Sequence, residues 1–260
     1  MSTPEPSFSV NVDVANPGQF FACCGLLELA HRLWPGTEGW FENGAFCVVL
    51  AAASPERGIN KLIRTLSETT LVSDESRGER ATHPVHFEVF GLMLDWWLDG
   101  GDWTDSGHSP FKMWAGQQTA IGIVEQLRTP LSDLLTEGSA DSCLDLAIPL
   151  TGRFGFDPRS AWRAIDAGFS PNEQGIEVGT YPAVELLAAV GLQVCRPRVG
   201  KTWQYVYSTW SSPLPAHIAP AAALGKLPLS GRRDWAFRIV KRGSYKGLDQ
   251  SIPWEPNNHD

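Results

Sequence analysis

The sequence lacks any apolar run long enough to span a bilayer, and none of its apolar segments has the form of a signal peptide. We therefore expect a cytoplasmic protein that makes no contact with a membrane. Cysteine is also scarce, because the chain has only five, an odd number, and they lie mostly inside apolar stretches. This pattern favours reduced, buried thiols over a disulfide framework.

Recognisable catalytic motifs are absent as well. The chain has no GxxxxGK[ST] phosphate loop, no GxSxG nucleophile elbow and no HExxH metal motif. Adjacent Cys23 and Cys24 lie in the most apolar stretch, whereas a reactive thiol needs an electropositive, partly exposed setting. His83 and His86 would supply two metal ligands where structural zinc needs four, and the acidic Asp95–Asp105 loop lacks the EF-hand spacing. We expect no enzyme activity, no cofactor and no bound metal.

The most strongly patterned stretch is Asn16–Trp34, where apolar residues recur at helical spacing. Asn16 suits the N-cap and Pro17 the first helical position, and Gln19 stands where a capping box reaches back to the cap. A helix this apolar is expected in a core rather than on a surface.

A second stretch, PAVELLAAVGLQ, aligns with the first, so that Ala22–Leu26 matches Ala188–Leu192 with a glycine at the same place. The match is explained either by chance or by two ordinary buried helices that each use a glycine for close packing.

The N-terminal elements follow the order of a ferredoxin-like unit. Alternation at Phe8–Val14 predicts a strand, and Asn43-Gly44 predicts a two-residue hairpin turn because both positions need positive φ. A helix from Pro55 to about Ser67 and a strand at Thr70–Ser73 complete the order β-α-β-β-α-β. The predicted fold class is therefore α+β with a ferredoxin-like βαββαβ N-terminal unit.

The clearest internal boundary is Gly138–Asp141. We expect residues 1–140 to form an N-terminal α+β half, residues 141–252 a C-terminal α+β half with a basic end, and residues 253–260 a flexible tail. The elements expected in the second half are a strand at Ser142–Pro149, helices beginning at Pro158 and Pro182, and strands at Trp203–Trp210 and Trp235–Lys241.

The net charge of −8 is unevenly distributed. Residues 193–260 contain ten Lys and Arg against four Asp and Glu, a balance of +6, whereas residues 1–192 carry −14. A basic end on an acidic body suggests an anionic partner for that end. A solvated basic surface, or docking on acidic protein, explains the same balance.

Three groups of residues have a composition suited to nucleic acid. A lysine, a tryptophan and two glutamines stand where a loop enters a helix, arginines alternate with phenylalanines in TGRFGFDPR, and cations crowd near the C-terminal end. A buried tryptophan with glutamines facing solvent explains the first group equally well. The candidate contacts are Lys112, Trp114, Gln117, Gln118, Arg153, Arg159, Arg232, Arg233, Arg238, Lys241, Arg242, Tyr245 and Lys246.

Several segments together resemble a small protein of bacterial type I-U (also called I-G) CRISPR–Cas systems. They are NPGQFFACCGLLELA, LDWWLDGG with FKMWAGQQ, TGRFGFDPRSAW, and PAVELLAAVGLQVCRPR with the RGSYK end, and they cover most of residues 8–247. The resemblance implies an antiviral-defence subunit related to the large, target-DNA-engaging component of a crRNA-guided effector complex, without catalytic activity. It also implies other effector-complex proteins and crRNA, target DNA or both as partners.

In such complexes base pairing reads the target, while protein subunits hold backbones and check a short flanking motif. The acidic overall charge departs from that of a free DNA-binding protein. It suits a subunit that meets nucleic acid over a limited patch and meets protein elsewhere.

Two other functions stay open from the residues alone. A protein-interaction scaffold without nucleic-acid contact would place Trp96, Trp97, Trp103 and Trp114 at an interface. A metal-dependent enzyme would use the Asp95–Asp105 loop.

Overall fold

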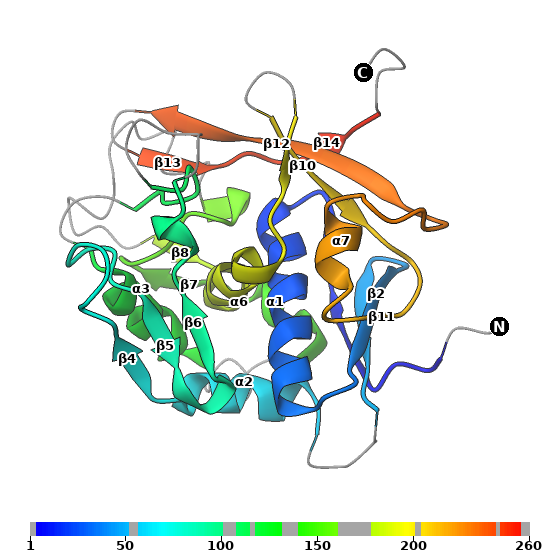
Figure 1. Cartoon of the computed structure of the whole chain (residues 1–260), viewed down its shortest axis with the longest axis horizontal. Coiled ribbons are helices and arrows are strands. Elements are labelled where there is room, and N and C mark those ends of the chain that lie inside the picture. The colour runs from blue at the N-terminus through cyan, green and yellow to red at the C-terminus, as the bar shows by residue number, and fades with distance from the viewer. Residues whose placement is uncertain are drawn as a thin grey trace.

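Two apolar helices, α1 (Pro17–Leu33) and α6 (Pro182–Val194), cross at the centre of the molecule, and the sheets lie around them (Figure 1). This computed structural model describes residues 4–51, 57–100, 108–114, 118–131, 140–160, 178–200, 204–242 and 245–255. Within these ranges the predicted α+β class is confirmed, with several small antiparallel sheets. No helix in the described ranges combines the length and apolarity needed to cross a bilayer.

The two central helices approach so closely that each needs a glycine at the crossing. A Cβ atom on Gly25 would lie 2.0 Å from the carbonyl oxygen of Leu187, and one on Gly191 would lie 1.9 Å from that of Phe21. The contact is symmetric, because the paired residues occupy equivalent places in the two aligned stretches. The prediction that both stretches are buried helices with a glycine for close packing is confirmed.

The start of α1 is capped nearly as predicted. Asn16 is the N-cap, its side-chain oxygen accepts a hydrogen bond from the Gln19 N–H at 3.1 Å, and Pro17 follows it. The predicted capping box is wrong in its second half. The Gln19 carboxamide oxygen accepts from the N–H of Asp13 at 2.6 Å instead of from the N–H of the cap residue.

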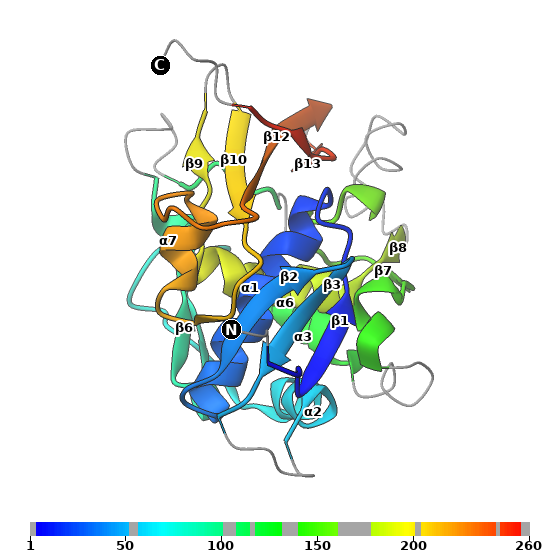
Figure 2. The ribbon, with the colours of Figure 1, turned by 90° about the vertical axis from the view of Figure 1, so that its right-hand side faces the viewer.

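The first sheet has the antiparallel order β1-β3-β2-β11 (Figure 2). The predicted turn between β2 and β3 is confirmed, with φ of 49° at Asn43 and 78° at Gly44. The strands are β1 (Phe8–Asn11), β2 (Glu38–Glu42), β3 (Ala45–Val49) and β11 (Leu214–Pro215).

The predicted ferredoxin-like sheet is wrong in its fourth strand. After β3 come α2 (Ile59–Glu68) and β4 (Leu71–Ser73), so the order of elements is confirmed. However, β4 pairs with β5 (Val85–Phe87), which pairs with β6 (Leu92–Leu94) in a separate sheet. In a ferredoxin-like unit β4 would pair with β1. Here β1 packs instead against the 3-10 helix η4 (Ala140–Asp145).

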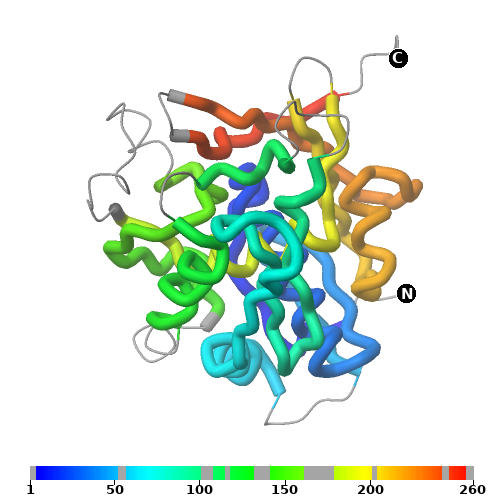
Figure 3. The backbone as a smooth tube through the Cα atoms, turned by 60° about the vertical axis from the view of Figure 1, so that its left-hand side comes forward, coloured from blue at the N-terminus to red at the C-terminus, as the bar shows by residue number. Residues whose placement is uncertain are grey.

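The second large sheet has the order β13-β12-β10-β9, and β14 also pairs with β12. Figure 3 shows β12 and β13 side by side along the edge of the molecule opposite α2. The strands are β9 (Arg198–Val199), β10 (Gln204–Thr209), β12 (Arg233–Arg242), β13 (Tyr245–Leu248) and β14 (Ile252–Pro253). The remaining elements are η1 (Glu88–Phe90), η2 (Trp96–Leu98), α3 (Ala120–Arg128), β7 (Ile148–Leu150), β8 (Val178–Thr180) and α7 (Ala219–Ala223).

Several predicted boundaries differ from the structure. The strand predicted at Phe8–Val14 ends at Asn11. The one predicted at Ser142–Pro149 begins in the 3-10 helix η4, and only its last two residues belong to a strand. The predicted tail begins too early, because Pro253 pairs with Trp235 in the sheet. Most of the helix expected from Pro158, and residues 256–260 of the tail, lie outside the described residues.

One hydrophobic core joins the two predicted halves through aromatic side chains of α1. The Phe20 ring stacks on Tyr207 of β10 with 4.0 Å between centroids and on Phe41 of β2 with 5.6 Å. Phe21 meets Phe237 of β12 edge to face at 6.0 Å. Both large sheets are therefore built against the same face of one helix.

The cysteines are buried and free, which confirms the sequence prediction. Burial raises the pKa of Cys23 and Cys24 well above its ordinary value, raises that of Cys143 to about 12, and raises that of Cys47. These thiols are consequently protonated and shielded at neutral pH.

Gly25→Ala tests the helix crossing. The new methyl group has no space beside the Leu187 carbonyl, so we expect the variant to lose about 3 kcal/mol of unfolding free energy or more. Lys61→Ala, at an exposed position of α2, is the matched control and should stay within about 0.5 kcal/mol of wild type. Urea unfolding measures both, and a Gly25→Ala variant as stable as wild type would contradict this packing.

Candidate nucleic-acid interface

The predicted basic end divides into separate groups along β12. Arg233 stands at the start of this strand and Lys241 near its end, about 27 Å apart at the usual rise per residue. Arg238 lies between them, exposed on the strand face opposite to Lys241. The basic residues therefore do not form one continuous strip.

Lys246 lies near two other lysines, Lys241 across the strand pair and Lys112 by its charge, and we call the three the lysine cluster: Lys112, Lys241 and Lys246. Lys241 lies directly opposite Lys246 in the antiparallel register, so their side chains leave the same face of the sheet. The chain next to Lys112 reaches the same place. A Cβ atom on Gly155 would lie 3.2 Å from the carbonyl oxygen of Lys246 and 3.7 Å from the Cε of Met113.

The positive charges of the lysine cluster are not neutralised by paired carboxylates among the described residues. Partial burial lowers the pKa of the Lys112 ammonium, the nearby Lys246 charge lowers it further, and Glu79 opposes the shift. Within the described ranges, none of the three lysines forms an ion pair with a carboxylate. Like charges opposite each other on neighbouring strands destabilise a sheet, so this arrangement does not serve the hairpin itself.

A buried carboxylate fixes the turn that supports this hairpin. Glu185 of α6 accepts four backbone hydrogen bonds of 2.8–3.0 Å from consecutive N–H groups, those of residues 154 to 157. Gly155 adopts φ of 93° in this turn, and its carbonyl oxygen accepts the N–H of Leu248 in β13 at 3.2 Å. The position of Lys246, two residues before Leu248, therefore depends on Glu185.

The Glu185 carboxyl group is fully buried, which controls its ionisation. Burial raises its pKa to about 7, and the charge of Asp157 adds to the rise, while the backbone hydrogen bonds and the nearby Arg153 oppose it. A sequence signal for this site exists, because Glu185 is the one charged residue in the apolar helix PAVELLAAVGLQV. A carboxylate in such a helix requires buried hydrogen-bond donors.

Two of the predicted contact residues are interior. Trp114 is 4% exposed and its Nε1 donates to the carbonyl oxygen of Ala81 at 3.2 Å, while Arg153 is 2% exposed. Both belong to the core, so the prediction that they contact nucleic acid is wrong for this conformation. Gln118 is half-buried, with its Nε2 donating to the Thr151 carbonyl oxygen at 3.4 Å.

Two further predicted contacts are held by neighbouring aspartates. Arg159 pairs with the buried Asp157 at 2.6 Å and lies 3.5 Å over the ring centroid of Tyr181. Arg232 pairs with Asp234 at 2.6 Å. Both guanidinium groups are thus committed within the chain, whereas Arg233, Arg238 and Lys241 are exposed. Gln117 and the side chains of Arg242 and Tyr245 lie outside the described residues.

The structure describes part of the two alternative sites. Among the described side chains, no group of three His, Cys, Asp or Glu is arranged to hold a metal ion. In the acidic loop, Asp95 accepts a hydrogen bond from Arg77 at 2.8 Å and Asp99 pairs with Arg196, while residues 101–107, including Trp103, are not described. The tryptophans proposed for an interface, Trp96, Trp97 and Trp114, are buried.

Comparisons with known proteins add no relative, because no protein-family model, no curated protein and no solved structure matches this chain.

The raised pKa of Glu185 predicts a pH-dependent stability. Between its ordinary value of 4.5 and about 7, the folded state binds the proton more tightly than the unfolded state, so this residue's contribution to the unfolding free energy falls as pH rises. The fall amounts to at most about 3 kcal/mol.

Glu185→Gln removes the titrating carboxyl group, so this variant is the reference against which the pH dependence of wild-type stability is measured. We expect the difference in unfolding free energy between wild type and this variant to drift by a few kcal/mol between pH 4.5 and 7, as measured by urea unfolding at several pH values. A difference that stays constant across this window would show that Glu185 does not titrate there.

Proposed function

We propose that the chain is a non-catalytic, cytoplasmic subunit of a crRNA-guided CRISPR–Cas effector complex of type I-U (I-G), in which the lysine cluster holds the backbone of crRNA or target DNA. The observation that carries the proposal is that Lys246 lies near both Lys241 and Lys112, and that none of the three forms an ion pair with a carboxylate among the described residues. The sequence resemblance supplies the system in which such a contact has a role.

The physical argument concerns the repulsion inside the lysine cluster. Cross-strand lysines destabilise the hairpin in the isolated chain, and a phosphate between them turns this repulsion into attraction. Each phosphate contact also releases condensed counterions, which adds a salt-dependent and sequence-independent increment to the affinity. Holding a backbone is one of the tasks that guide-directed complexes leave to their proteins, because base pairing reads the target.

The net charge of −8 restricts where nucleic acid binds. An acidic body repels phosphates everywhere except at a local basic patch, so the contact is limited in extent. The remaining surface is then free for the other proteins of the complex.

A triple variant, Lys112→Ala with Lys241→Ala and Lys246→Ala, tests this function. We expect the wild-type chain to bind single-stranded RNA or DNA 20-mers at low salt, with log affinity falling linearly with log salt. Loss of three phosphate contacts on a single strand should flatten that slope by about 2 units and weaken binding at low salt. Fluorescence anisotropy across a salt series measures both quantities.

The matched control removes three exposed cations elsewhere, at Lys61, Arg64 and Lys226, and changes the net charge by the same amount. It should keep the wild-type slope. Equal slopes for the triple variant and wild type would remove the nucleic-acid role from the lysine cluster. If the triple variant instead lost its association with co-expressed effector-complex proteins while nucleic-acid affinity stayed unchanged, a protein-interaction scaffold would be the correct function.

A further inference from the structure

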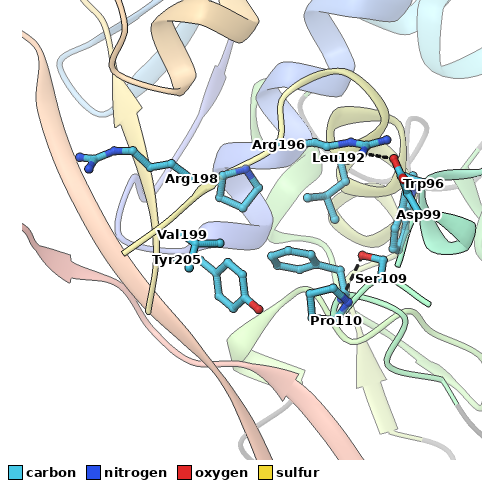
Figure 4. A pocket seen from close by; sticks show the side chains of 11 residues that line it. Trp96, Asp99, Ser109, Pro110, Leu192, Arg196, Arg198, Val199 and Tyr205 are labelled. Carbon is cyan, nitrogen blue, oxygen red and sulfur yellow. Dashed lines mark hydrogen bonds and ion pairs between the residues drawn. The ribbon is translucent and has the colours of Figure 1, made fainter. Parts of the chain in front are cut away.

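A cavity of about 250 Å³ lies between the C-terminal end of α6, η2, and strands β9 and β10 (Figure 4). Its walls are mainly apolar and include Leu192, Pro110, Val199 and the ring of Tyr205. Arg196 and Asp99 form an ion pair at its rim. The Arg198 guanidinium points away from the cavity in Figure 4 and pairs with Asp234 at 3.0 Å.

The Tyr205 side chain gives the cavity wall both an aromatic ring and a hydroxyl group. The residue is 8% exposed and its ring packs edge to face on Phe111, with 4.8 Å between centroids. Within the described part of the chain, this hydroxyl has no hydrogen-bond partner, whereas the Tyr207 hydroxyl on the same strand has two. Although the residue is nearly buried, its hydroxyl oxygen still reaches solvent, so it is available to hydrogen-bond to a ligand in the adjoining cavity.

The cavity and the lysine cluster share one face of the same sheet. Tyr205 pairs with Val199 on one side and with Phe237 on the other, so all three side chains lie on one face. Lys241 is four residues beyond Phe237 on β12 and therefore lies on that face too, about 13 Å along the strand. Phe111 borders the cavity and is followed in the chain by Lys112, so the two sites also meet through this segment.

We propose that this cavity takes one unpaired nucleobase from the single strand whose phosphates lie on the lysine cluster, an inference that rests on the proposed function. The base stacks among the apolar and aromatic walls and hydrogen-bonds to the Tyr205 hydroxyl. The Arg196–Asp99 pair offers both a donor and an acceptor at the rim, where the edge of a heterocycle emerges. A few nucleotides span the distance between this base and the lysines.

The size and chemistry of the cavity favour a single base over other ligands. Its volume lies just below the usual range for sites that bind drug-sized molecules, so it suits one heterocycle. Base stacking on aromatic side chains is tolerant of sequence, because every base has a π-face. Such a pocket strengthens a single-strand contact without requiring a particular target.

Two 12-mers with the same number of phosphates separate this inference from the proposed function: oligothymidylate, and a strand in which every nucleotide is abasic. The full-length chain should bind oligothymidylate about 10-fold more tightly than the abasic strand, as measured by fluorescence anisotropy. Val199→Trp fills the cavity from the exposed edge strand β9. This variant should bind both strands equally, with an affinity for the abasic strand equal to that of wild type.

Tyr205→Phe keeps the ring and removes only the hydroxyl, so we expect an intermediate preference for the strand with bases. The triple lysine variant should lose affinity for both strands by the same factor and keep the 10-fold preference. Thermal unfolding checks that the Val199→Trp protein is folded.

Equal binding of both strands by wild type would overturn the base pocket and leave the phosphate contact standing. A full preference retained in both Val199→Trp and Tyr205→Phe would also overturn it, because the base would then lie elsewhere. No binding of either strand at low salt would overturn the proposed function and the pocket together.

Discussion

The approach of α1 to α6 determines the spacing of the whole fold. Helices of ordinary composition stay 8–10 Å apart because their side chains separate the backbones. At Gly25 and Gly191 each helix instead places a carbonyl oxygen where the Cβ of the other would be. The first sheet and the second sheet both pack on α1, whereas α6 packs on α3, β6 and η4, so the crossing sets the distance between these two groups of elements. An added methyl group at the crossing would push α1, with the sheets that pack on it, away from α6.

Helix α6 also holds the strand β13 at the surface, through the buried side chain of Glu185. Its Glu185 is acceptable in an apolar interior because four consecutive N–H groups satisfy the carboxylate, and these N–H groups are satisfied by it in return. The turn that supplies them holds β13 through the hydrogen bond from Leu248 to Gly155. The hairpin of β12 and β13 lies at the edge of the molecule, but these hydrogen bonds connect it to α6 and so to the helix crossing.

Local features of the fold were predictable from the sequence, because their causes lie within a few residues. The cap at Asn16 and the turn at Asn43-Gly44 each depend on one side chain or on two φ angles, and both are present. The departure of β4 from the first sheet has a distant cause, since the 3-10 helix that packs on β1 begins at residue 140. No periodicity within residues 8–73 carries that information.

The candidate site also has some features with a local cause in the sequence and others with a distant one. The engagement of Arg159 by Asp157 and of Arg232 by Asp234 involves residues two apart, a spacing visible in the sequence. The meeting of Lys112 with the hairpin, and the cavity beside Tyr205, bring together segments that are far apart in the sequence, such as Phe111 and Leu192. A count of charges finds the basic end, but only the register of β12 and β13 shows which lysines face each other.

All five thiols are buried, so the folded chain should react slowly with cysteine reagents. A single cysteine introduced at an exposed position, for example by Lys226→Cys, becomes the sole attachment point for a fluorophore or spin label. The native thiols then need no replacement, which matters because Cys23 and Cys24 stand next to the glycine of the helix crossing. Distances from such a label to a labelled strand or to a partner protein are therefore measurable in a chain whose core is left intact.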